Sequence, residues 1–131
     1  MTLVYGVLFI MLLGIPATLL HELGHILAAA MCGVKVKKVG LSRVGLYTVR
    51  EPGPRWANLC VSLAGPLFNL LLAATLREVA PTFAWVNLMA CAYNLLPIPN
   101  SDGRRILALL APERVVATAE MPPARLQNRL V

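Results

Sequence analysis

The chain has 131 residues, enough for one domain, and 58% of them are hydrophobic while 14% are charged. Soluble domains hold roughly 45–50% apolar and about 25% charged residues, so this composition excludes an ordinary soluble domain and favours a membrane protein. The net charge of +6 comes from basic residues clustered at 35–55 and 104–129, beside the apolar runs. That clustering fits loops at an anionic lipid surface better than a nucleic-acid interface.

Residues 3–33 form the first predicted membrane-spanning helix, because they are apolar over more than the ~20 residues that cross a bilayer. Within them lies His21-Glu22-Leu23-Gly24-His25, whose two histidines project from one helix face. Such a pair is spaced to hold a single metal ion. Glu22 is placed beside it to take a proton from a water molecule that the metal activates.

Residues 34–55 predict a short basic β-hairpin at the membrane surface, since valines alternate with lysines and glycines suggest a turn. The hairpin is either a connecting loop or a sheet edge to which an extended peptide adds as a further strand. For the second interpretation, the substrate-guiding candidates are Val36, Val39, Leu46 and Tyr47.

Residues 56–77 form the second predicted span, with a stripe of small and polar residues that suits helix packing. Asn69, on this stripe, either makes an interhelical hydrogen bond or lies near the metal or substrate. The third span, 83–110, is predicted to be broken at Pro97 and Pro99, because two prolines so close together exclude a regular helix. Residues 111–131 are predicted to be a cytoplasmic tail.

Asp102 follows this break and is the one acidic residue besides Glu22 inside a hydrophobic segment. A lone carboxylate in lipid is costly without a cation, so Asp102 is the strongest candidate for a third ligand beside His21 and His25. Catalytic zinc sites use three protein ligands and keep one position open. We therefore predict one Zn²⁺ per chain.

The basic loop at 35–55 and the arginine-rich tail fall on the same side of three spans. The positive-inside rule then predicts an N-terminus outside, with the hairpin and the C-terminus in the cytoplasm. We expect a multi-pass integral protein, in the plasma membrane of a prokaryote.

Three segments resemble the site-2 protease family of intramembrane zinc metalloproteases: 21–25, 64–69 (AGPLFN) and 94–103 (NLLPIPNSDG). They match, in order, the three helices of that family's catalytic core. The resemblance implies a minimal all-α core of three transmembrane helices with a hairpin after the first, as a single domain over residues 1–131. The site residues it implies are His21, His25 and Asp102 as zinc ligands, Glu22 as general base, and Asn69 and Asn94 as nearby polar groups. Ser101 departs from the family's usual leucine, and Arg104 from a common glycine.

The function expected from these features is a zinc endopeptidase that cleaves transmembrane segments of membrane proteins. One alternative is a non-catalytic relative that binds membrane proteins, which loss of Glu22 or of a ligand would mark; all four residues are present. Another is a metal-handling protein, which would spread its ligands along a path. The expected partners are a transmembrane substrate and the lipid bilayer, without nucleic acid. Self-association or an accessory membrane protein stays open.

Overall fold

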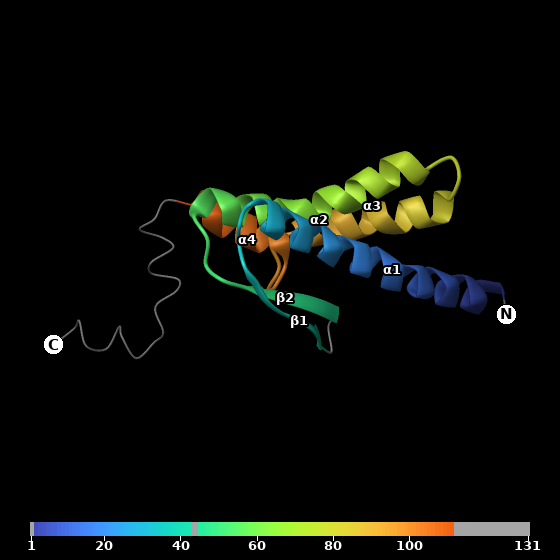
Figure 1. Cartoon of the computed structure of the whole chain (residues 1–131). Coiled ribbons are helices and arrows are strands. Elements are labelled where there is room, and N and C mark those ends of the chain that lie inside the picture. Colours follow the sequence, from blue (N-terminus) through green and yellow to red (C-terminus); the bar gives the residue numbers. More distant parts are fainter. Residues whose placement is uncertain (1, 43–44, 112–131) are drawn as a thin grey trace.

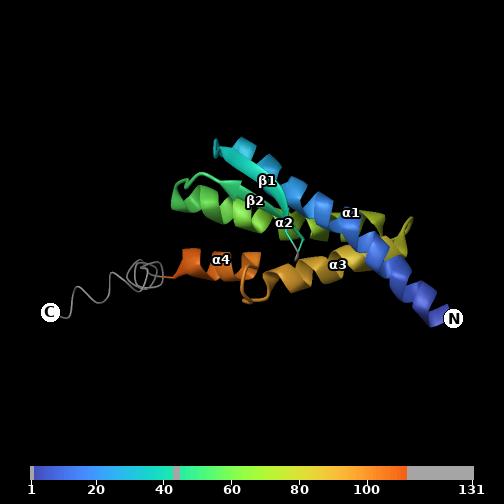
Figure 2. The ribbon, with the colours of Figure 1, turned by 90° about the horizontal axis from the view of Figure 1, so that it is seen from below.

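The computed structural model describes residues 2–42 and 45–111, so nearly all of the predicted tail lies outside the described residues. Three helices, α1 (Thr2–Met31), α2 (Arg55–Leu76) and α3 (Pro81–Leu95), pack against one another. The strands β1 (Val36–Ser42) and β2 (Gly45–Arg50) lie along one side of this bundle, and α4 (Asp102–Leu110) continues beyond α3 (Figures 1 and 2). The fold is mostly helical, as predicted.

Two of the helices are long and apolar enough to cross a membrane: residues Leu3–Met31 and Arg55–Leu76. In the most apolar window of α1, 6% of the residues are buried within the protein, so its apolar side chains face outward. Helices α3 and α4 have 15 and 9 residues. At about 1.5 Å per residue, neither alone crosses a hydrocarbon core of about 30 Å. The third span therefore stays a prediction.

Helix α1 ends at a glycine that turns the chain toward the strands. Gly33 has a φ of 69°, a left-handed conformation that costs glycine little. Its N–H donates to Ala30 O at 3.2 Å, and Val34 N–H donates to Ala29 O at 2.8 Å. This is the hydrogen-bond pattern of a Schellman cap. The side chain of Val34 is thereby buried in a small cluster with Ala29, Ala57 and Val61.

Strands β1 and β2 pair antiparallel, with Val39 opposite Thr48 and Gly40 opposite Tyr47. Val36 packs against the cluster where α1 meets α2, so this side chain is partly buried, whereas Val39 is exposed. The backbones of Leu46 and Tyr47 lie in β2, but their side chains fall outside the described residues. Val39 is thus the candidate guiding side chain that the structure describes as exposed.

The predicted break at Pro97 and Pro99 lies between α3 and α4. Ser101 organises it: its hydroxyl lies 2.5 Å from Leu96 O and 2.8 Å from Ile98 O, and donates its one proton to either. The same oxygen accepts the N–H of Arg104 at 3.2 Å, which makes Ser101 the N-cap of α4. A hydroxyl that closes the break and caps the helix is a physical reason for a serine here.

The far end of α4 is fastened to the start of α2. Arg55 donates from Nε to Leu109 O at 2.6 Å and from Nη2 to Ala111 O at 2.5 Å. These carbonyls belong to the last turn of α4 and its C-cap, which have no helical donors of their own. Capped at both ends, α4 holds Asp102 in a fixed place against α1 and α2.

Candidate metal centre

Three side-chain atoms meet at the centre of the bundle, two from α1 and one from the first residue of α4. The Nε2 atoms of His21 and His25 lie 3.1 Å apart. Oδ2 of Asp102 lies 3.0 Å from the first and 3.1 Å from the second. All three residues are buried, with about 5% of their surface exposed. The break between α3 and α4 thus brings Asp102 back to the helix face that carries both histidines.

The fourth member of the motif, Glu22, lies at the same place without belonging to that triangle. Ligand-type atoms of His21, Glu22 and His25 all lie within 4.8 Å of one another. Glu22 is partly exposed, unlike the other three. It is therefore the most accessible member of this group.

The triangle fits a tetrahedral metal ion. Two atoms bound to zinc at about 2.0–2.1 Å in tetrahedral geometry lie about 3.3 Å apart, close to the separations here. The protonation of His25 agrees: its Nδ1 lies 2.6 Å from Val61 O, and because a carbonyl only accepts, Nδ1 carries the proton. In the neutral ring the bare Nε2 then faces another nitrogen and a carboxylate oxygen. A cation among the three atoms relieves this repulsion.

Two glycines let α2 approach the centre. A Cβ on Gly65 would collide with Nε2 of His25 and would lie 2.7 Å from Cε1 of His21. One on Gly24 would lie 2.9 Å from the backbone oxygen of Ala64. The face of α2 that carries Gly65 is therefore a wall of the site, shaped by the absence of a side chain.

Arg105 contacts the carboxylate of Asp102 from its other side. Its Nη1 lies 3.5 Å from Oδ1 of Asp102, while Oδ2 points at the histidines. The Arg105 side chain is half exposed, so the ion pair is a weak one. The two carboxylate oxygens nevertheless have different partners: Oδ1 faces Arg105, and Oδ2 faces the histidines. No role was predicted for Arg105 from the sequence.

The structure places the two predicted auxiliary amides differently. Asn69, on α2, is fully buried, and neither end of its amide has a hydrogen-bond partner among the residues that the structure describes. Asn94, on α3, is partly buried and donates to Ala90 O of its own helix at 3.0 Å. Asn87, also on α3, is fully buried as well, and its side-chain oxygen has no hydrogen-bond partner within the described part of the chain. For Asn87, too, no role was predicted from the sequence.

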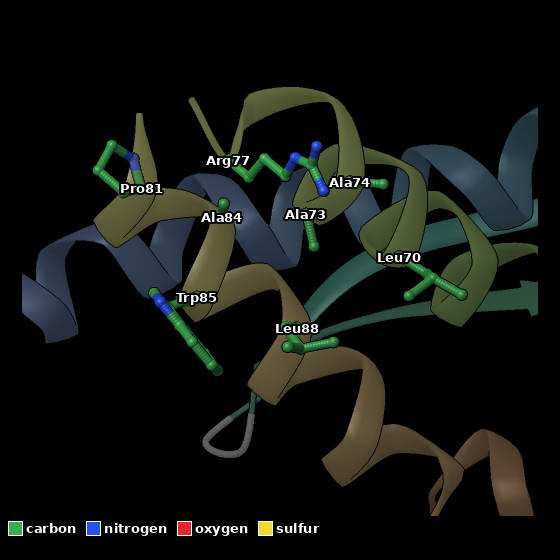
Figure 3. A pocket seen from close by; sticks show the side chains of 8 residues that line it. All are labelled: Leu70, Ala73, Ala74, Arg77, Pro81, Ala84, Trp85 and Leu88. Carbon is green, nitrogen blue, oxygen red and sulfur yellow. The ribbon is translucent and has the colours of Figure 1, made fainter. Parts of the chain in front are cut away.

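A cavity of about 300 Å³ lies away from the metal centre, between α2 and α3 near their connection. Its walls are mostly apolar, with Trp85 and Leu88 on one helix and Leu70 on the other, and Arg77 at its rim (Figure 3). It contains none of the candidate ligands, so it has no part in the metal centre.

Known proteins resemble the chain over a region that includes both histidines of this centre. The model of Peptidase family M50 matches residues 8–81. A zinc metalloprotease of Methanocaldococcus jannaschii is 33% identical over 116 residues, which cover 79% of this chain and 34% of that protein. Stage IV sporulation protein FB of Bacillus subtilis is 36% identical over 105 residues, covering 70% of this chain and 36% of that protein.

The fold gives the same result. The solved structure of a site-2 protease from Methanocaldococcus jannaschii matches with a TM-score of 0.68 and 30% identity, over 76% of this chain and 52% of that one. The chain spans about a third of the length of the curated relatives it matches. Because the family model covers more than half of the chain, and the fold match is at 30% identity, the chain belongs to Peptidase family M50, the family of the site-2 proteases.

Proposed function

We propose that the chain is an intramembrane zinc endopeptidase that hydrolyses peptide bonds in or near transmembrane segments of other proteins. One observation carries this proposal: two histidine nitrogens and a carboxylate oxygen converge within 3.1 Å, beside Glu22. The convergence is buried among helices whose outer surfaces are apolar. A metalloprotease needs this set of groups, and a substrate from the bilayer can approach along such surfaces.

His21, His25 and Asp102 would hold one Zn²⁺. The bound ion would supply a Lewis acid that polarises a peptide carbonyl and makes water more acidic. Burial supports the assignment of ligands and base, since the three ligands are enclosed whereas Glu22, the base, is partly exposed. A ligand gains from enclosure, but a residue that exchanges protons with water and substrate needs access.

Glu22 would act as the general base and then as the acid. Its carboxylate takes a proton from the attacking water while the water oxygen forms a bond to the peptide carbon. The same proton then passes to the amide nitrogen as the carbon–nitrogen bond breaks, which gives a carboxylic acid and an amine. The two transfers need one carboxylate within reach of both water and leaving nitrogen, and Glu22 is the accessible acid beside the ligands.

The substrate would be locally unwound, because an amide inside a helix is shielded by its own hydrogen bonds. The two-stranded sheet offers an extended peptide a place to pair. Val39 on β1 is exposed, and both strands contact α1, the helix that carries the motif. We assign the sheet a guiding role, with Val36, Val39, Leu46 and Tyr47 as its candidate residues.

We orient the chain with its strands and C-terminus in the cytoplasm. The described side chains of Lys35, Lys37 and Lys38 are exposed at the strand end of the bundle. At the other end, Arg77 pairs with Glu78 at 3.1 Å, which leaves that connection nearly neutral. This asymmetry is the one that the positive-inside rule describes.

The proposal is tested on protein reconstituted into proteoliposomes with single-span membrane proteins that carry helix-breaking residues in their spans. Wild type is expected to contain one zinc per chain by elemental analysis and to cleave at least one substrate. Glu22→Gln should retain the zinc and lose cleavage. Asp102→Asn should lose both. A wild type without stoichiometric zinc, or a Glu22→Gln variant that cleaves as well, contradicts the mechanism.

The same experiment separates the non-catalytic alternative. A binding relative would hold zinc and co-purify with membrane proteins, yet wild type and Glu22→Gln would leave every substrate intact. Adding a zinc chelator would then change nothing in the cleavage assay. Cleavage that stops on chelation and returns with zinc supports the enzyme.

A further inference from the structure

Four buried side-chain atoms have no hydrogen-bond partner among the described residues: Nδ1 of His21, Nδ2 and Oδ1 of Asn69, and Oδ1 of Asn87. Such atoms are rare in folded proteins, since a buried polar group without a partner is costly. Asn69 and Asn87 have no exposed surface. Each unpaired atom therefore needs a physical explanation.

The positions of Asn69 on α2 and Asn87 on α3 indicate that these atoms lie on one side of the metal centre. Asn69 lies one helical turn beyond Gly65 on the same face of α2, and a Cβ on Gly65 would meet the rings of both histidines. Helices α1 and α2 run antiparallel there, since His25 contacts Val61 while His21 lies against Gly65. Residues of α2 that follow Gly65 therefore lie beside residues of α1 that precede His21.

Asn87, on α3, lies at the same level of the helix bundle as Asn69 on α2. Ala73 and Ala84 line one cavity between α2 and α3, and Figure 3 shows their side chains across from one another. Asn69 lies four residues before Ala73, and Asn87 lies three residues after Ala84. Each amide thus lies on the same buried helix face as its alanine, one turn farther from the connection between α2 and α3.

The donors and acceptors among the four atoms can be paired in one sequence, from His21 to Asn69 to Asn87. If His21 binds the metal through Nε2, its Nδ1 carries a proton and is a donor. Asn69 offers one acceptor oxygen and one donor nitrogen, which carries two N–H groups. Asn87 offers an acceptor, because its Nδ2 already donates to Phe83 O at 2.8 Å. Each of the four unpaired atoms therefore has a complementary partner among the others, and one N–H of Asn69 remains.

We infer that Asn69 and Asn87 form a hydrogen-bonded relay behind the metal centre. Nδ1–H of His21 donates to a water that bridges to Oδ1 of Asn69, and Nδ2–H of Asn69 donates to a second water that bridges to Oδ1 of Asn87, because no direct hydrogen bond joins these atoms. The relay rests on the proposed function in one respect, that His21 is a metal ligand. Asn69 is then a positioning residue, which fixes the tautomer and ring orientation of His21, and Asn87 supports it.

The relay predicts an effect on metal affinity, because partners of metal-bound histidines typically contribute 10- to 100-fold. Zinc affinity is measured by chelator competition on the full chain in detergent. Asn69→Leu should weaken it at least tenfold, and Asn87→Leu less. The double variant should be no weaker than Asn69→Leu, since the path to Asn87 passes through Asn69. Asn58→Leu is the matched control on α2, because Asn58 Nδ2 already donates to Gly53 O at 2.7 Å.

A second measurement keeps the test independent of folding defects. In the Co²⁺-loaded protein, the imidazole N–H signals of His21 and His25 are resolved by paramagnetic NMR. Asn69→Leu should speed exchange of the His21 N–H with water and leave that of His25, which is bonded to Val61 O, unchanged. Asn69→Asp keeps the acceptor, so it should restore slow exchange and near-wild-type affinity.

The outcomes are distinct. Wild type without stoichiometric zinc overturns the proposed function itself. Zinc-loaded wild type with an Asn69→Leu variant of equal affinity and exchange overturns the relay alone. Additive losses in the double variant, or an Asn69→Asp variant as weak as Asn69→Leu, also contradict it.

Discussion

Nε2 of His21 lies 3.0 Å from Oδ2 of Asp102, although 81 residues separate them along the chain. His21 belongs to α1, whereas Asp102 opens α4, the last helix described. Between them lie both strands and two helices, none of which supplies an atom to the triangle. A metal ion at this point would therefore cross-link the first helix to the last, and its binding would be coupled to the stability of the whole bundle.

Zinc removal is expected to lower the melting temperature in detergent. A ligand that binds the folded state at 100 times its Kd stabilises it by about 2.7 kcal/mol. Asp102→Asn should lose most of this zinc-dependent shift. Glu22→Gln should keep it, because we assign Glu22 as a base and not as a ligand. A Glu22→Gln variant that no longer responds to zinc would reassign Glu22 to the ligand set.

Gly65→Ala should damage the metal centre without changing any ligand. The added methyl group would meet the rings of His25 and His21, which are held by their helix, so the cost resembles overpacking at about 1–3 kcal/mol. Zinc content by elemental analysis should fall, with a loss of affinity of at least tenfold. The control is Gly14→Ala, where a Cβ meets nothing within 4 Å. Equal zinc content in both variants would contradict a tight wall at Gly65.

How far the sequence predicts this site depends on how local each feature is. The spacing of His21 and His25 fixes their common face, because helical periodicity is a local property. Asp102 could be inferred from its scarcity, since few acids lie in apolar segments. The carbonyl of Val61 as partner of His25 could not, because every residue has a carbonyl and packing alone selects one.

The fold shows the same contrast between local features, which the sequence predicts, and long-range contacts, which it does not. The prolines at 97 and 99 located the break, and the structure ends α3 at Leu95 and begins α4 at Asp102. The strand positions also agree with the alternating stretch at 34–55. The contacts of Arg55 with the end of α4 join residues 54 and 56 positions apart, and no sequence pattern indicates them. Long-range contacts made to backbone atoms are thus what the sequence leaves undetermined.

Ser101→Ala should destabilise the start of α4. Loss of an N-cap costs about 0.5–2 kcal/mol, and here the hydroxyl also closes the proline-containing break. We expect a lower thermal midpoint and weaker zinc binding, since Asp102 is the next residue. Ser101→Thr should recover part of both. Thr75→Ala is the control, because Thr75 bonds to its own helix away from the site. Unaltered stability in Ser101→Ala would refute a capping role.

Arg105→Gln should weaken zinc binding slightly, because it removes the contact with Oδ1 of Asp102 at 3.5 Å. Exposed ion pairs contribute about 0.2–1 kcal/mol, so the expected loss is below about fivefold and should shrink at high salt. Arg104→Gln changes the net charge equally and lies at an exposed position beside it. Its affinity should stay at the wild-type value. If both variants weaken zinc equally at every salt concentration, the general charge near the site matters and the contact with Asp102 does not.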